Sequence, residues 1–297
     1  MSRLTKNIKT PVEIISILMM FFMMVGCGDS NRHPVIGGGY GIGEKVDDKR
    51  EGYWKFYGDN DSLKAEGNYV NNLAEGEWKF YHPNGTLQEQ SIWTKDLVNG
   101  PITTWHENGK IHYKGKFIMN KKDGYWEYYY TDGSLMQQEY YINGREDSAW
   151  TWYYPTGGIE QIQTFRDSAV SGPFVKYFEN GHKQMEGNYF FNLQDGDWYT
   201  YYEDGTLQDH SIYKNGKLNG HAVGYHPNSM KRFEGNYIND LEEGIITWYY
   251  DNGKKQVEGN YTKGKENGTF TYYTVEGKVN YTRTYVNGTE LLDNTGE

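Results

Sequence analysis

Histidine and carboxylate side chains are the residues of this 297-residue chain that could support catalysis or bind a metal. His82, His106 and His226 occupy equivalent positions just before a recurring turn, where other segments of the chain carry tyrosine. A zinc site needs three or four ligands that converge on one point. Because His226 lies far along the chain from the other two, we expect these rings to replace tyrosine in a repeated structural role, and we predict no metal site.

Adjacent acids such as Glu146-Asp147 and Glu242-Glu243 are the closest approach to a catalytic carboxylate pair. Glycoside hydrolysis requires two carboxylates about 5–10 Å apart across a cleft, whereas these pairs stand beside the links between structural units, as solvated charge does. The sequence contains no Gly-x-Ser-x-Gly elbow, Walker loop or HExxH motif. We therefore predict no catalytic residues, no cofactor and no enzymatic activity.

Composition limits the class of protein and of partner. The chain has 40 acidic and 30 basic side chains and a formal net charge of −10, and binding of nucleic acid needs clustered Lys and Arg. Nucleic acid is therefore excluded as a partner. Aromatic residues make up 17% of the chain although the mean hydropathy is −0.88. Disordered chains are poor in aromatic residues, so this composition favours β-strands joined by tight turns.

The N-terminal residues have the pattern of a secretory signal. Arg3, Lys6 and Lys9 precede an apolar run from Ile14 to Val25 that only one serine interrupts. A basic start, a short apolar core and small residues before a cleavage point are typical of such signals. The run is too short for a transmembrane helix, which needs about 20 apolar residues.

The stretch Met24-Val25-Gly26-Cys27, which holds the only cysteine, resembles the lipobox of bacterial lipoproteins. The resemblance implies that residues 1–26 are removed, that Cys27 carries lipid, and that the protein is anchored at the outer membrane or cell surface of a bacterium. A signal that is cleaved without lipidation is the alternative. Residues 27–51 are rich in glycine, and we expect them to form a flexible tether.

A period of 24 residues organises the rest of the chain, with ten units and no insertion. The first position of the units is occupied by Gly52, Gly76, Gly100, Gly124, Ser148, Gly172, Gly196, Gly220, Gly244 and Gly268. Five places later stand the aromatic residues Tyr57, Tyr81, Trp105, Tyr129, Tyr153, Tyr177, Tyr201, Tyr225, Tyr249 and Tyr273. A second aromatic set follows at Tyr69, Trp93, Phe117, Tyr141, Phe165, Tyr189, Tyr213, Tyr237, Tyr261 and Tyr285.

Each unit has the pattern of a β-hairpin. Dipeptides such as Asn84-Gly85 and Asp132-Gly133 separate two apolar runs, which is the strongest short-range hairpin signal. Pro83 suits the second position of a type I turn, and the glycine then takes the left-handed conformation at low cost. We therefore predict a three-residue loop, in which a type I turn is followed by a glycine bulge.

This loop sets the strand register, because a one-residue slip moves every side chain to the other face of the sheet. It places Tyr81 opposite Leu87 and Tyr129 opposite Leu135. The second aromatic of each unit should share the face of these tyrosines, and the early tryptophans should lie on the opposite face. We predict an all-β fold, an elongated single-sheet array of ten stacked antiparallel β-hairpins over residues 52–291, with a tail at 292–297.

Within this period the chain shows the pattern Gly-x-Trp-x-x-Tyr, Asn-Gly, Glu-Gly-Asn-Tyr and Asn-Gly, and the units nearest to it include Gly76–Asn99 and Gly244–Asn267. The pattern resembles the MORN-type repeat and, more closely, the MORN-variant repeats of the YwqK-like family, which is described as the antitoxin half of a toxin–antitoxin module. The resemblance implies stacked β-hairpins that bind proteins or lipids without chemistry. It also opens the role of an antitoxin or immunity protein that blocks a dedicated toxin.

A weaker resemblance points to a glycan. The segment Trp198–Leu207, in which tryptophan and tyrosines precede Asp204-Gly205, resembles choline- and glucan-binding wall repeats. It implies a glycan- or cell-wall-binding module as a second alternative. The leading prediction is a lipid-anchored, non-enzymatic binding or scaffold module for a protein partner.

Tryptophan and tyrosine anchor interfaces and stack on sugars, so an exposed stripe of them would mark a binding face. The alternative is that these rings are the core of the fold. The residues predicted for such an aromatic binding face are Trp54, Trp78, Trp126, Trp150, Trp152, Trp198 and Trp248.

Overall fold

A computed structural model describes residues 31–291. This part of the chain is all-β and contains 26 strands, each antiparallel to the strands with which it pairs, and no helix. It therefore contains no helix that could cross a membrane. The predicted signal at 1–26, the lipidation site Cys27 and the tail at 292–297 lie outside the described residues.

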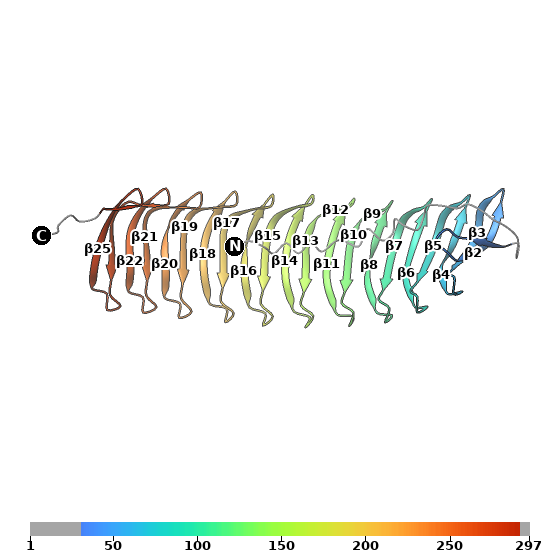
Figure 1. The fold of residues 1–297 in the computed structure, drawn as a ribbon, viewed down its shortest axis with the longest axis horizontal. Coiled ribbons are helices and arrows are strands. Elements are labelled where there is room, and N and C mark those ends of the chain that lie inside the picture. The colour runs from blue at the N-terminus through green and yellow to red at the C-terminus, as the bar shows by residue number, and fades with distance from the viewer. Residues whose placement is uncertain (1–30, 292–297) are drawn as a thin grey trace. The chain divides into compact units, whose positions relative to one another are not determined.

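The described chain forms two compact units, residues 31–100 with 107–109 and residues 101–106 with 110–291. Within each unit consecutive strands lie side by side in chain order (Figure 1). The first unit contains β1 (Arg32–Pro34), β2 (Tyr40–Val46), β3 (Lys49–Tyr57), β4 (Leu63–Val70), β5 (Leu73–Tyr81) and β6 (Leu87–Thr94). Strand β7 (Leu97–Trp105) contributes its first residues to this unit and its last ones to the second.

The second unit continues the same hairpin pattern. Its strands are β8 (Ile111–Ile118), β9 (Lys121–Lys122), β10 (Gly124–Tyr129), β11 (Leu135–Ile142), β12 (Arg145–Glu146), β13 (Ser148–Tyr153), β14 (Ile159–Arg166), β15 (Ala169–Tyr177), β16 (Lys183–Phe190), β17 (Leu193–Tyr201), β18 (Leu207–Lys214), β19 (Lys217–Tyr225), β20 (Lys231–Ile238), β21 (Leu241–Tyr249), β22 (Lys255–Thr262), β23 (Lys265–Glu266), β24 (Gly268–Tyr273), β25 (Val279–Val286) and β26 (Thr289–Leu291). The predicted all-β fold of stacked antiparallel hairpins is confirmed.

The longer loop of each hairpin has the predicted geometry. Between β5 and β6 the Gly85 N–H donates to the carbonyl of His82 at 2.9 Å, and Gly85 has a φ of +85°. Tyr81 lies opposite Leu87, as the three-residue loop requires. Tyr129 and Leu135 are paired in the same way.

The links between successive hairpins are two-residue turns in which both residues have positive φ. Asn71 and Asn72 have φ values of 52° and 71°, and Asn143 and Gly144 have 52° and 86°. This combination defines the type I′ turn, whose twist matches that of the strands it joins. Within each unit the chain is therefore a meander, in which each long strand pairs with the long strands before and after it, as β4 pairs with β3 and β5.

The glycine-rich segment before the first repeat is not a tether over residues 32–51, so that prediction is wrong there. Strands β1 and β2 and the start of β3 occupy this segment, and β2 pairs with β3. The reason is the packing of Trp54, because a Cβ on Gly43 would come within 2.3 Å of its indole ring. Gly43 is therefore a packing position in an additional strand that covers Trp54.

The predicted assignment of side chains to faces is also wrong. The register shifts between Phe80 and Tyr81, because Phe80 pairs with Glu89 and Tyr81 pairs with Leu87, so that Gln88 of β6 is the extra residue of a β-bulge. This extra residue changes which side chains of β6 share a face with those of β5. Trp78 and Phe80 consequently share a face with Trp93, with ring centroids 6.4 Å from it in both cases. Tyr81 instead shares the face of Glu66, to which its hydroxyl donates a hydrogen bond of 2.5 Å. The early tryptophans and the second aromatics form one core face.

The residue that begins each repeat has a positive φ, which accounts for the recurring glycine. Gly76, Gly124 and Gly196 have φ values of 72°, 73° and 76°, and Ser148 takes the same conformation at 59°. Glycine adopts this region freely, whereas a residue with a Cβ is strained there. The repeat that begins at Ser148 therefore carries strain at its first position that the repeats beginning with glycine lack.

Replacing Ser148 by glycine should raise the free energy of unfolding by about 0.5–1 kcal/mol, because the strain of a left-handed residue exceeds the extra chain entropy of glycine. The reverse change, Gly244→Ser, should lower it by a similar amount, since nothing lies within 4 Å of a Cβ there and only the φ of +79° is unfavourable. Urea unfolding followed by tryptophan fluorescence measures both changes. A lower midpoint for Ser148→Gly than for the native protein would contradict this account.

Candidate functional site

One position in each repeat, two residues after the first, forms the centre of the core. Its relative exposure lies between 0% and 8% in all ten repeats. The residues are Trp54, Trp78, Ile102, Trp126, Trp150, Phe174, Trp198, Ala222, Ile246 and Phe270. Such burial within a single layer of strands needs a side chain that lies flat on the sheet.

The neighbouring strand provides the space for the flat rings. Trp78 lies directly opposite Gly67, and a Cβ on that glycine would come within 2.2 Å of the indole ring. The same distance is 2.4 Å for Gly187 and Trp198. A side chain at either glycine would push the ring off the sheet and expose it to water.

The indole N–H groups of these rings also have partners. Trp78 Nε1 donates to the backbone carbonyl of Asn68 at 3.2 Å, and Trp198 Nε1 donates to that of Asn188 at 3.1 Å. A buried indole needs such an acceptor, because an unpaired N–H costs free energy. Trp78 and Trp198 are therefore fixed both by the ring and by the polar atom, whereas the buried Nε1 of Trp126 has no hydrogen-bond partner in the described part of the chain.

The structure places the predicted binding tryptophans in the core instead of on an exposed face. Trp54, Trp78, Trp126, Trp150 and Trp198 have relative exposures of 1%, 3%, 1%, 7% and 4%. Trp152 and Trp248 are half-buried, with ring centroids 6.0 Å from those of Trp150 and Tyr261 respectively. The prediction of an aromatic binding face made of these residues is wrong, because the bulge brings the tryptophans onto the packed side.

Replacing Gly187 by alanine should lower the free energy of unfolding by about 1–3 kcal/mol, the usual cost of overpacking, because the new Cβ would displace the Trp198 ring. Gly158→Ala is the matched control, since a Cβ there has no atom within 4 Å and the backbone is not left-handed. Its effect should be near zero or slightly stabilising. Thermal unfolding followed by circular dichroism compares the two, and equal midpoints would argue against the ring-on-glycine contact.

One buried ion pair interrupts the apolar core of the second unit. Glu139 stands where the preceding repeat has Gly115, and it is 8% exposed. Lys122 Nζ lies 3.3 Å from Glu139 Oε2 and donates to the hydroxyls of Tyr141, at 3.2 Å, and Tyr128. The pair is therefore enclosed by polar partners and by the aromatic core.

Burial dominates the electrostatics of this cluster. The Lys122 ammonium lies 4.7 Å from the centroid of Trp126 and 4.6 Å from that of Tyr141. Burial lowers the pKa of Lys122, against the opposing effect of Glu139, and burial raises the pKa values of Tyr128 and Tyr141. A lysine with a lowered pKa suits carbonyl chemistry, but the two surface hollows described below are lined by other residues. The arrangement fits a structural ion pair.

Removing one member of the pair should cost more than removing both. Glu139→Gly alone should lower the free energy of unfolding by about 1–3 kcal/mol, because the Lys122 charge stays buried without its counter-charge. The double variant Lys122→Val/Glu139→Gly restores the residue types of the preceding repeat, Val98 and Gly115, and should match or exceed native stability. Urea midpoints of the three proteins decide this, and additive losses would contradict it.

The same proteins should differ in their dependence on pH. The pKa of Lys122 is lowered in the folded state, so the folded chain binds fewer protons there than the unfolded chain. Native stability should therefore rise relative to the double variant as pH increases from below the lowered pKa toward the ordinary value of 10.5. Unfolding midpoints measured from pH 7 to 10.5 test the sign.

The recurring histidines have the predicted role of replacing tyrosine. His106 Nε2 lies 3.1 Å from the carbonyl oxygen of Tyr129, and His226 Nε2 lies 3.0 Å from that of Tyr249. Tyr202 occupies the same position in its repeat and donates to the equivalent carbonyl at 2.7 Å. Within residues 31–291 no group of three or more His, Cys, Asp and Glu side chains is arranged to hold a metal ion.

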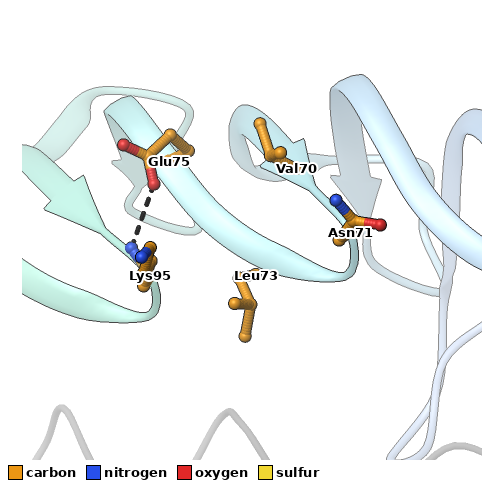
Figure 2. Close-up of a pocket in the computed structure, with 5 residues that line it drawn as sticks. All are labelled: Val70, Asn71, Leu73, Glu75 and Lys95. Carbon is orange, nitrogen blue, oxygen red and sulfur yellow. Dashed lines mark hydrogen bonds between the residues drawn. The ribbon is translucent and has the colours of Figure 1, made fainter.

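In the first unit, apolar side chains are exposed beside a type I′ turn. Val70 and Leu73 face each other across this turn and are 46% and 38% exposed. With Asn71, Glu75 and Lys95 they line a shallow hollow of about 390 Å³ (Figure 2). The Lys95 backbone N–H donates to Glu75 Oε2 at 3.0 Å, which fixes one wall of the hollow.

The second unit has a longer row of such residues. They flank or occupy its type I′ turns and are between 38% and 57% exposed. The row consists of Ile118, Met119, Ile142, Phe190, Phe191, Leu193, Ile238, Leu241 and Val286. They form clusters at the turns 119–120, 143–144, 191–192, 239–240 and 287–288, and the turns between these clusters, at 167–168, 215–216 and 263–264, carry polar and charged residues. Exposed apolar patches with a polar rim mark interaction surfaces. Sequence reasoning directed at tryptophan missed this row, although its signal is visible as apolar residues beside turn dipeptides.

A second surface feature of this unit is a groove of about 530 Å³ across β15, β16 and β17. Asp197 and Tyr199 are among the residues that line it. The Tyr199 ring stacks on His210 at 4.5 Å, and His210 Nε2 lies 2.7 Å from Asp197 Oδ1. The groove thus combines an aromatic ring with polar side chains.

Comparisons with solved structures give only remote likeness. The TcdB2–TccC3–Cdc42 complex matches at 11% identity with a TM-score of 0.20, over 87% of this chain and 16% of that chain. The Tc holotoxin pore of Photorhabdus luminescens matches at 11% identity with a TM-score of 0.18, over 86% of this chain and 17% of that one. This chain thus spans less than a fifth of either protein, and likeness at these TM-scores says nothing about its fold or function. No curated protein matches the sequence.

The repeats themselves match a family model, that of the MORN repeat variant. The matches fall on residues 50–71, 74–94, 98–118, 122–143, 146–167, 194–215 and 242–263. Together they cover just over half of the chain, and each follows the 24-residue period and the hairpin described above. The chain therefore belongs to the MORN repeat variant family.

Proposed function

We propose that this protein is a non-enzymatic binding or scaffold module that holds a protein partner at the type I′ turns of its second unit. Membership of the MORN repeat variant family indicates a repeat module for binding or scaffolding. The finer assignment, a protein partner, rests on the surface that the fold leaves apolar.

The exposed row at the type I′ turns is the observation that carries the proposal. In a chain with a mean hydropathy of −0.88, nine apolar side chains of one unit are at least 38% exposed at one kind of turn. The core does not need them, because it is formed by the ring face on the other side of the strands. Apolar and aromatic anchors surrounded by polar residues are the usual composition of protein interfaces.

We further propose that the module is anchored through lipid on Cys27 in the bacterial envelope, at the outer membrane or cell surface. The support is the sequence of residues 1–27, with its basic start, short apolar run and lipobox-like end. One class of partner is a cognate toxin, in keeping with the YwqK-like resemblance. An antitoxin that carries an export signal would meet its toxin in the envelope.

A pull-down tests the proposal. Full-length, affinity-tagged protein extracted from native membranes should retain one stoichiometric protein, identified by mass spectrometry. Deletion of residues 110–291 should abolish retention, because the apolar row belongs to the second unit. A Cys27→Ala variant controls for the anchor and should shift the protein out of the membrane fraction. A toxin among the retained proteins would support the antitoxin role, and repeated absence of any stoichiometric protein would overturn the protein-partner proposal.

The groove beside Tyr199 favours a glycan as a second candidate. Sugar sites combine an aromatic ring that stacks on C–H groups with carboxylates or amides that bind hydroxyls. Tyr199, Asp197 and Asn188 offer these groups within one groove. Sedimentation with purified cell wall that is lost on Tyr199→Ala, a half-buried ring outside the core, would support this candidate. Unchanged sedimentation would exclude this groove.

A further inference from the structure

The most exposed aromatic cluster of the second unit lies at one type I′ turn. We call Phe190, Phe191 and Leu193 the Phe190 patch. Their exposed fractions are 57%, 52% and 46%, and the two phenylalanine rings meet edge to face at 4.9 Å. Phe190 and Leu193 are paired across the turn, so the three side chains project from one hairpin end.

The backbone of Phe191 is unfavourable for phenylalanine. It has a φ of +45° as the first residue of the turn. Five of the other described turns hold asparagine at this position, the remaining ones hold aspartate, lysine or methionine, and only Phe191 is aromatic. A left-handed conformation costs a residue with a bulky Cβ substituent about 1–2 kcal/mol, and asparagine tolerates it. Because half of the ring is exposed, burial in the core does not offset this cost. Strain that does not serve the fold indicates a role outside it.

Basic side chains flank the patch on both sides. Arg166 precedes the neighbouring turn on one side, and Lys214 and Lys217 enclose the turn on the other. All three are exposed, and none of them is in an ion pair within the described part of the chain. Asp167 lies next to Arg166, but its carboxylate is paired with Arg145 at 2.6 Å. The patch is therefore an apolar centre between positive charges on a protein whose net charge is −10.

The three turns are fixed relative to one another by backbone hydrogen bonds. The Asn192 N–H donates to the carbonyl of Val170 at 2.8 Å, and the Gly216 N–H donates to that of Gln194 at 2.8 Å. Leu193 packs against the second of these turns, since a Cβ on Gly216 would lie 3.2 Å from its Cδ2. The basic groups and the apolar centre thus form a preorganised surface.

We propose that the Phe190 patch is the docking site for a protein segment that carries an apolar anchor between two carboxylates, an inference that rests on the proposed function. Successive turns are two strands apart, or about 10 Å at the usual strand spacing of about 4.8 Å. The two carboxylates should therefore be about 20 Å apart. This corresponds to about six residues in an extended segment or about 13 in a helix.

A protein segment fits the charges better than an anionic membrane does. A bilayer is flat and would meet the whole row of turns, including carboxylates such as Asp240 in the turn beyond Lys214 and Lys217. A single segment reaches only the Phe190 patch and the basic groups beside it. Local attraction can then act although the protein as a whole is anionic.

The probe is a phage-displayed library of random 16-residue peptides, selected on the full-length protein. The expected result is enrichment of peptides with an apolar residue between two acids at one of the two spacings. Synthetic versions of the enriched peptides should bind at least tenfold more weakly to Phe191→Asn and to Lys214→Glu/Lys217→Glu. Their affinity should also fall as the salt concentration rises.

Phe191→Asn separates binding from folding, because it places the favoured residue in the turn and should leave the unfolding midpoint unchanged or higher. Met119→Asn is the matched control, since Met119 holds the same turn position with a φ of +49°, and it should bind the peptides like the native protein. No enrichment, or equal peptide affinity for Phe191→Asn, would overturn the proposal. Binding to phosphatidylglycerol vesicles without peptide binding, lost in Phe191→Asn, would overturn it in favour of a membrane.

The pull-down distinguishes this inference from the proposed function. If the native protein retains a partner that Phe191→Asn retains equally, the partner binds elsewhere and only the Phe190 patch is excluded. If the native protein retains no partner, the proposed function fails as well.

Discussion

A flat ring lying on a glycine of the next strand is the contact on which the rest of the fold depends. A single layer of strands has no second layer to cover its apolar face, so a side chain can be buried only by lying down on the sheet. Trp78 on Gly67 and Trp198 on Gly187 show this arrangement, with no room for a Cβ beneath the ring. The residue with positive φ that begins each repeat belongs to the same arrangement. The 24-residue period is therefore the spacing at which a ring, its glycine and the bulge can recur.

This packing also decides where function can lie. The buried tryptophans form the core and are therefore unavailable to a partner. Their replacement by alanine would lower stability before it affected binding. The face of Tyr81 and Glu66 carries hydrogen-bonded pairs between neighbouring strands, so it too is partly committed to the fold. The hairpin ends are the places where side chains can vary without disturbing a ring. The exposed apolar row of the second unit lies at these ends.

Turn geometry follows from local backbone preferences and could be predicted from the sequence. The face of the sheet on which each side chain lies could not, because it depends on whether an extra residue interrupts the alternation. The three-residue loop and the pairing of Tyr81 with Leu87 follow from Pro83 and Gly85, whose backbone preferences are local. The predicted faces of the aromatic side chains are wrong because the one extra residue at the bulge changes the alternation of side chains along the strand. No residue type in the sequence marks that extra residue. Gly43 cannot be told from a tether residue by sequence, because a glycine beneath a ring and a glycine in a flexible chain look the same there. The Phe190 patch contains no tryptophan, and its signal in the sequence is an aromatic residue at a turn position that holds asparagine, aspartate, lysine or methionine in the other described turns.

Departures from the repeat pattern differ in whether the fold compensates them. His106 replaces a tyrosine but keeps its contact with the next carbonyl, and Glu139 replaces a glycine but is paired with Lys122. A contact inside the protein compensates each of these two changes, so neither requires a partner. Phe191 places an aromatic ring at a strained backbone position where five other turns hold asparagine, and half of its ring remains exposed to water. Nothing inside the fold offsets that change, and an external surface that covers the ring would. In a repeat protein, a residue that departs from the repeat pattern and is not compensated by any internal contact is therefore a better indicator of a recognition site than aromatic content is.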